Sequence, residues 1–206
     1  EFNEAVERII AGPERKSRVI SPREKEMTAY HEAGHALTAW ILPHADQVHK
    51  ISIVARGNMG GHTSLLPDED RYLWTKNQFQ DMLAVMMGGR VAEQQIFDEV
   101  TTGASDDLER GTKVALSMIK RYGMSETLGP RTFGKREELV FLGREISEQR
   151  DYGDRVAEEI DEEVKDIIKM AYQRSEEILI THKPKLVRMA EYLIEHESVS
   201  GDLVGR

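Results

Sequence analysis

The stretch that decides the fold is SPREKEMTAYHEAGHALTAWIL, residues 21–42. Ser21 can cap a helix, Pro22 suits the first helical position, and Glu24 stands where a capping box needs an acidic residue. Apolar residues then recur at spacings of three and four, which gives one core-facing stripe: Met27, Tyr30, Ala33, Leu37 and Ile41. Because Pro43 ends this pattern, the sequence predicts a helix over residues 22–42.

Within this helix, residues 31–35 read HEAGH and match the pattern H-E-x-x-H. His31 and His35 lie one turn apart, so both side chains project from one helix face and can bind a single zinc ion. Zinc lowers the pKa of a bound water toward ~7, so that Glu32 can take its proton and later pass it to a leaving amine. The pattern therefore predicts peptide-bond hydrolysis without a covalent intermediate.

A catalytic zinc site needs a third protein ligand. The chain contains no cysteine, so this ligand must be an imidazole or a carboxylate. Glu93 is one candidate, because a helical glutamate after the motif is the ligand in thermolysin-like enzymes. Asp106 and Asp107 are the others, although acidic residues in a first helical turn also interact favourably with the helix dipole without any metal. The residue pattern by itself leaves this choice open.

The rest of the chain predicts a mainly α fold with a small β hairpin next to the helix that carries the motif. The hairpin comes from β-branched or alternating runs at 48–55 and 61–66, on either side of a glycine-containing turn. Ser105 is expected to cap one helix, and Thr75 with Gln78 another. Helices are predicted over residues 1–10, 76–97, 105–122, 147–180 and 184–195, and a loop over 124–145. Gly88-Gly89 within the second of these predicts close backbone packing, since glycine otherwise weakens a helix.

Composition limits the function classes. A formal charge of -9 over 206 residues argues against nucleic acid as a partner, because phosphate binding needs positive charge. No apolar run approaches the ~20 residues that span a bilayer, and the first residues lack the pattern of a secretory signal. We expect the chain to be soluble as given and, since it begins inside a predicted helix without methionine, to be part of a longer protein.

Four ordered motifs resemble the peptidase domain of the FtsH family of membrane-anchored AAA zinc metalloproteases. They are HEAGH at 31–35, MGGRVAE at 87–93, TTGASDDL at 101–108 and YGMSETLGP at 122–130. The similarity covers nearly the whole chain. In that family the third zinc ligand is the aspartate of a G-A-S-N-D motif, which corresponds to Asp107. The resemblance makes Glu93 a neighbouring residue, and a switch of ligand to Asp106, where the family commonly has asparagine, remains the alternative.

The resemblance also implies what lies around this domain. Residues 1–20 resemble the end of a preceding ATPase module and its linker, and residues 21–206 the peptidase domain. The function implied is an ATP-dependent, processive zinc endopeptidase that hydrolyses unfolded or membrane proteins. The implied assembly is a homohexamer with a membrane anchor, with this domain on the cytoplasmic side or the equivalent organellar side. No phosphate-binding glycine loop occurs in these residues, so ATP would bind elsewhere in the protein.

Three points stay open. The run at 61–66 could pair with an extended substrate or be an ordinary edge strand. Arg90 could orient a carboxylate or simply pack on its helix. The competing function is a catalytically inactive helical assembly or partner-binding module. The presence of Glu32 argues against it, because a degenerate enzyme often loses its water-activating group.

Overall fold

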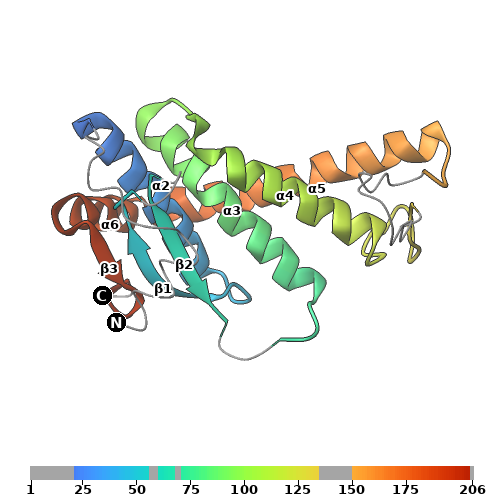
Figure 1. The fold of residues 1–206 in the computed structure, drawn as a ribbon, viewed down its shortest axis with the longest axis horizontal. Helices are drawn as coiled ribbons and strands as arrows, with labels where there is room; N and C mark the ends of the chain where they lie inside the picture. Colours follow the sequence, from blue (N-terminus) through green and yellow to red (C-terminus); the bar gives the residue numbers. More distant parts are fainter. Residues whose placement is uncertain (1–20, 56–59, 68–70, 135–149, 205–206) are drawn as a thin grey trace, which may run out of the picture.

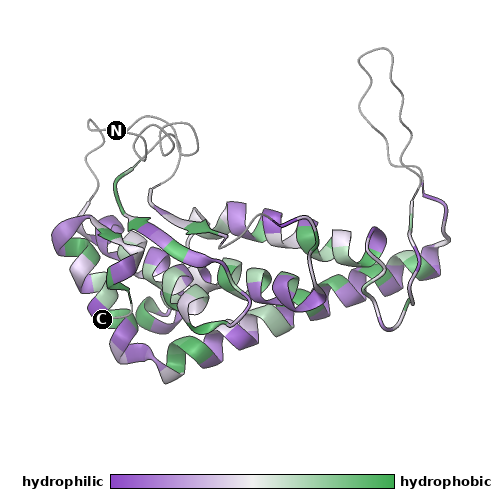
Figure 2. Ribbon diagram, turned by 90° about the horizontal axis from the view of Figure 1, so that it is seen from below, coloured by the Kyte–Doolittle hydropathy of each residue, from purple (hydrophilic) through white to green (hydrophobic). Residues whose placement is uncertain are grey.

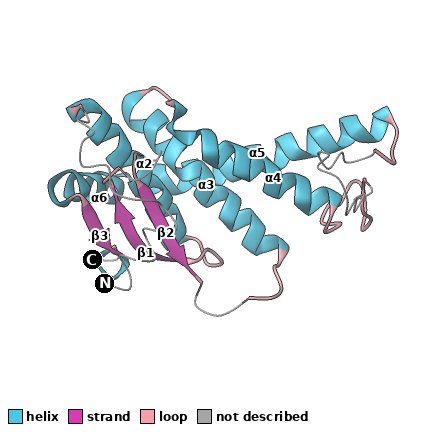
Figure 3. Ribbon diagram, viewed as in Figure 1, coloured by secondary structure: helices cyan, strands magenta, loops and turns pink. Residues whose placement is uncertain are grey.

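The computed structural model describes residues 21–55, 60–67, 71–134 and 150–204. This part of the chain is mainly helical, with its strands gathered in one small sheet at one side of the molecule (Figure 3). The predicted fold class is confirmed. The helices are α2 (Pro22–Ile41), α3 (Lys76–Phe97), α4 (Ser105–Lys120), α5 (Asp154–Thr181) and α6 (Lys183–His196), and the strands are β1 (Gln47–Ser52), β2 (His62–Leu66) and β3 (Ser198–Ser200). None of these helices is long and apolar enough to cross a membrane.

Helix α2 is the centre of the fold. Its predicted capping box is confirmed, because Ser21 Oγ accepts from the Glu24 N–H at 3.2 Å while the Glu24 carboxylate accepts from the Ser21 N–H at 3.3 Å. From Ala29 to Ala39 every residue of the helix is buried. The helix packs against α3, α6 and β1, and every residue of the motif at 31–35 is buried.

Helix α3 crosses α2 at very short distance. Its own capping box, Thr75 with Gln78, is also confirmed. A Cβ placed on Gly34 would lie 2.3 Å from the Gly88 carbonyl oxygen, and one on Gly88 would lie 2.7 Å from the Gly34 oxygen. Only glycine at both positions permits this crossing. The expectation of close packing at the paired glycines of α3 is therefore confirmed.

The sheet has the order β2-β1-β3, with both pairs antiparallel. The predicted hairpin is present as β1 and β2, although β1 ends at Ser52, three residues before the predicted end. The third strand was not predicted. It pairs Val199 with Ile51, and at three residues it is too short to display the alternation by which a strand is recognised. Among the described residues no strand pairs with the outer side of β2, which is therefore an edge strand.

Helices α4 and α5 run side by side away from the sheet (Figure 1). Polar and apolar residues alternate along α5 (Figure 2), and its buried Ile160, Ala171 and Leu179 pack within this chain. Two predictions here were wrong. A helix was expected from residue 147, but residues 150–153 are not helical and α5 begins at Asp154. Ser105 was expected to cap α4, but it is the first residue of that helix and makes no capping hydrogen bond, because a 3-10 turn leads directly into α4.

Several predictions fall outside the described residues. These are the helix at 1–10 and the segment 1–20 as a whole, part of the turn between β1 and β2, and the second half of the loop expected over 124–145. The described residues 124–134 of that loop form neither helix nor strand, as expected.

Candidate metal centre

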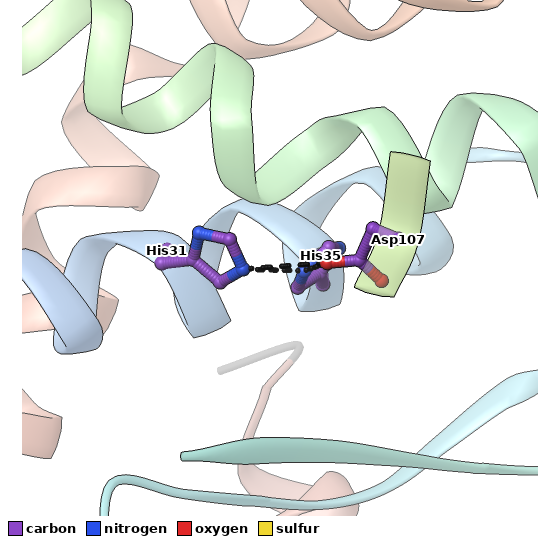
Figure 4. A group of neighbouring side chains, drawn as sticks. All are labelled: His31, His35 and Asp107. Atoms are coloured by element: carbon purple, nitrogen blue, oxygen red, sulfur yellow. Dashed lines mark hydrogen bonds and ion pairs between the residues drawn. The ribbon is translucent and has the colours of Figure 1, made fainter. Parts of the chain in front are cut away.

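Two histidines on successive turns of α2 direct their rings to one point. His31 and His35 are both buried, and their Nε2 atoms lie 3.0 Å apart (Figure 4). The rings meet edge to face, with centroids 4.7 Å apart. The helix repeat places both side chains on the same face, as the motif predicts.

Asp107 reaches these nitrogens from the first turn of α4. Its Oδ2 lies 3.5 Å from His31 Nε2 and 3.3 Å from His35 Nε2. The three residues offer donor atoms that all lie within 4.8 Å of one another, and they are the one such group in the described part of the chain. Segments far apart in the sequence are thus brought together at one potential metal site.

The donor set fits zinc. Nitrogen and oxygen ligands about 2.1 Å from a tetrahedral ion are about 3.4 Å from one another, and the three donors here are separated by similar distances. Two imidazoles and one carboxylate leave the fourth position of a tetrahedral site for water or substrate, which is the arrangement of catalytic zinc sites.

Each imidazole is fixed by its second nitrogen. His31 Nδ1 lies 2.7 Å from Glu93 Oε1, and His35 Nδ1 donates to the Val85 carbonyl oxygen at 2.7 Å. A proton on Nδ1 leaves the lone pair of Nε2 directed toward the site, so these contacts select the tautomer that binds a metal. Both partners, Val85 and Glu93, belong to α3.

Glu93 is itself held in place and does not join the donor cluster. Its side chain is only 2 % exposed. Thr101 donates to it twice, through its N–H to Oε2 at 2.7 Å and through its hydroxyl to Oε1 at 3.1 Å. Asp106, the other candidate ligand, is exposed beside Asp107. Thr101 was missed by sequence reasoning, and its only signal was its place in the motif at 101–108.

The side chain of Glu32, on α2, contacts strand β2. It is buried, and the Thr63 hydroxyl lies 2.8 Å from its Oε2 and 3.1 Å from its backbone oxygen. Gly61 packs so closely that a Cβ there would lie 2.9 Å from Glu32 Oε1. The edge strand therefore begins directly against the carboxylate that the motif assigns to catalysis.

The surrounding carboxylates make this pocket strongly favourable for positive charge. Burial lowers the pKa of His31, but hydrogen bonds to Asp107 and Glu93 outweigh it and raise that pKa to about 10. Burial raises the pKa of Asp107, yet hydrogen bonds from His31 and His35 bring it well below its ordinary value. For Glu93 burial likewise raises the pKa, while the bonds from His31 and Thr101 lower it overall. A divalent cation supplies the charge that this arrangement favours.

A helical fold in which an H-E-x-x-H helix meets a carboxylate from a later helix defines a metallopeptidase domain. The profile of peptidase family M41 matches residues 18–206, and the chain belongs to this family. It is 62% identical over 201 residues to the ATP-dependent zinc metalloprotease FtsH 1 of Sphaerobacter thermophilus, and 61% identical over 201 residues to that of Thermomicrobium roseum. Each alignment covers 98% of this chain and 31% of the relative, so the chain spans about a third of the length of these relatives. The expected family resemblance is confirmed.

Proposed function

We propose that this chain is the peptidase domain of an ATP-dependent zinc endopeptidase, with His31, His35 and Asp107 as zinc ligands and Glu32 as general base. The observation that carries the proposal is the cluster of three donor atoms next to a buried, intact Glu32. Its support from outside the chain is membership of peptidase family M41 and the zinc metalloprotease names of its relatives.

The residues divide the chemistry among them. Zinc in this site would activate water and polarise the scissile carbonyl. Glu32 would accept the proton of the attacking water and deliver it to the leaving amine. Thr63 restrains Glu32 through its hydroxyl, so the carboxylate is oriented before substrate arrives. Glu93 and the Val85 carbonyl hold the two imidazoles, which removes rotational freedom from the ligands.

The substrate is proposed to bind as an added strand along β2. An extended peptide can use the backbone groups that an edge strand leaves unpaired. The contact of Thr63 with Glu32 would bring a peptide on this edge close to the general base. Recognition through backbone hydrogen bonds is tolerant of sequence but requires an unfolded chain, which fits a peptidase acting on unfolded proteins.

The remaining parts of the proposal concern the longer protein. The relatives named ATP-dependent zinc metalloprotease FtsH are about three times as long as this chain. We infer that residues 1–20 form the end of an ATPase module and linker, and that residues 21–206 form the peptidase domain. Homohexameric assembly, a membrane anchor, a cytoplasmic-side location and protein substrates threaded by ATP hydrolysis complete this proposal. Nucleic acid is not among the proposed partners.

The test combines zinc analysis with peptide cleavage. Wild type is expected to bind one zinc per chain and to cleave an unstructured peptide, which needs no ATP-driven unfolding. The Asp107→Ala variant should lose both zinc binding and cleavage. The Asp106→Ala variant should retain both, because Asp106 is exposed and lies outside the donor cluster. Glu93→Ala should weaken zinc binding ~10- to 100-fold, as loss of a residue that orients a ligand does.

Two results would contradict this assignment. If Glu93→Ala or Asp106→Ala loses zinc while Asp107→Ala keeps it, the residue replaced in the variant that loses zinc is the third ligand. A wild-type chain that binds zinc but cleaves no peptide, even when joined to its ATPase module, would favour the inactive helical assembly module instead.

A further inference from the structure

Helix α3 meets the two metal-binding rings with three residues spaced four apart. Val85 and Glu93 hold the Nδ1 atoms of His35 and His31, each at 2.7 Å. Gly89 lies midway between them on the same helix face, because positions i, i+4 and i+8 lie nearly in line. The residue between the two hydrogen-bonding partners thus has no side chain.

The space in front of Gly89 is filled by the ring atoms that would bind the metal. A Cβ at this position would lie 2.5 Å from both Cε1 and Nε2 of His31, and 2.6 Å from Nε2 of His35. Real Cβ atoms essentially never approach other atoms within 3.0 Å. The rings cannot simply turn aside, since their Nδ1 atoms are held by the same helix.

Gly88 and Gly89 are neighbours in the sequence but serve different contacts. A Cβ on Gly88 would meet the backbone oxygen and carbon of Gly34 at 2.7 and 2.9 Å, so this glycine permits the helices to cross. A Cβ on Gly89 would meet only imidazole atoms at its nearest contacts. The close crossing of α2 and α3 therefore explains why position 88 has no side chain. At position 89 the explanation lies in the imidazoles of the metal centre.

We propose that Gly89 is a positioning residue for zinc, because the absence of its side chain allows the Nε2 atoms of His31 and His35 to converge on the ion while α3 holds their Nδ1 atoms. A methyl group here would displace the rings from the ion even though every ligand is retained. This inference rests on the proposed zinc site, and it adds a requirement that the ligand residues alone do not express.

The experiment compares three single glycine substitutions. In Gly89→Ala the dissociation constant for zinc, measured by competition with a chelator, should rise at least ~10-fold relative to wild type. In Gly111→Ala, on α4, the added methyl would meet side-chain atoms at 3.4 to 3.6 Å, and zinc binding should stay within about threefold of wild type. In Gly88→Ala the melting temperature should fall both with zinc and with EDTA, because the clash is with backbone.

A second measurement keeps the proposal testable where Gly89→Ala does not fold. The substitution is repeated in a chain that carries His31→Ala and His35→Ala, in which the conflicting rings are absent. The proposal expects Gly89→Ala to be harmless to the melting temperature in this background, since alanine favours a helix over glycine. If Gly89→Ala still prevents folding or clearly lowers the melting temperature in this background, the conflict lies elsewhere and the proposal is overturned.

The remaining outcomes separate this inference from the proposed function. A folded Gly89→Ala chain that binds zinc as tightly as wild type would overturn the role of Gly89 and leave the zinc site intact. A wild-type chain that itself binds no zinc would overturn the site, and the inference with it.

Discussion

Glu32 and Glu93 are both buried and both lie close enough to His31 to act on its charge, yet their contacts differ. Glu93 is bound on all sides, by His31 and twice by Thr101, so it has no oxygen free for a reaction. Glu32 contacts Thr63 on the edge strand beside the proposed peptide position. The contacts give Glu93 a role in holding a ligand and leave proton transfer to Glu32.

Replacing Glu32 by glutamine should therefore separate metal binding from catalysis. The amide keeps the size of the carboxylate but cannot accept a proton, so peptide cleavage should fall ~100- to 10,000-fold while zinc stoichiometry stays at the wild-type value. Metal analysis and cleavage rates on the same preparation measure both. Glu26→Gln, at an exposed position of the same helix, is the matched control. Cleavage by Glu32→Gln at the wild-type rate would rule out this glutamate as the general base.

Zinc binding should depend on pH through His31. Because the carboxylates of Asp107 and Glu93 raise the pKa of His31 to about 10, the ring without zinc carries a proton at neutral pH. Zinc binds the neutral imidazole and must displace that proton, so its apparent affinity should increase with pH, about tenfold per pH unit for one proton. Asp107 contributes no proton in this range, since its pKa is lowered.

Calorimetric titrations with zinc in buffers of different ionisation enthalpy would count the released protons. Near pH 7.5 His31 is expected to release about one proton per zinc, in addition to any proton lost by a zinc-bound water. The same titration of His31→Ala should release correspondingly fewer protons. A wild-type zinc affinity that is constant between about pH 6.5 and about pH 8.5 would contradict the proposed competition.

At the scale of elements, the first turns of α2 and α3 show why their starts could be predicted so closely. Both contain a capping box, in which the residue types at two fixed positions determine the local hydrogen bonds. Ser105 looked similar in the sequence, but the preceding 3-10 turn holds it in helical conformation and prevents capping. Strand β3 forms by pairing with the side of β1 that faces away from β2. This pairing depends on a strand far away in the sequence, so it could not be predicted from residues 198–200 alone.

The metal centre divides in the same way. The spacing at 31–35 predicts two converging histidines from the helix repeat alone. Asp107 could be preferred to Glu93 only through the family resemblance, because both are acidic residues on predicted helices. The Val85 carbonyl could not have been predicted at all, since every residue has a backbone oxygen and only the packing of α3 on α2 directs this one to His35.

The capping box of α3 offers a test at this scale. Thr75→Ala removes the hydroxyl that accepts from the Gln78 N–H at 3.2 Å, and should lower the free energy of unfolding by about 1 kcal/mol. Zinc affinity should not change, because Val85, Gly89 and Glu93 lie more than two turns further along the helix. Urea unfolding measures the first quantity and chelator competition the second. Thr112→Ala, an exposed threonine inside α4, is the control, and an equal loss of stability there would argue against a specific capping effect.

At the scale of the whole molecule, α3 links the site to the rest of the fold. It packs on α2 with one face and on α5 with another, so its position determines where the ligand-holding groups lie. A buried carboxylate fixes it near its first turns. Asp81 is fully buried, its Oδ2 accepts from the His44 N–H at 3.0 Å, and its Oδ1 lies 2.9 Å from Arg174 Nη1 on α5. One side chain thus joins α3 to α5 and to the segment that follows α2.

Breaking this link from its two sides should have unequal effects. Arg174→Ala leaves the Asp81 carboxylate buried without its cation, and should lower the free energy of unfolding by about 3 kcal/mol. Asp81→Asn should cost less, because the amide oxygen can still accept from His44 and the partly exposed Arg174 can turn to water. Adding Asp81→Asn to Arg174→Ala should therefore recover stability, which urea unfolding of the two single variants and the double variant would measure. If the two single losses simply add in the double variant, the arginine is not compensating a buried charge, and α3 is held against α5 by apolar packing alone.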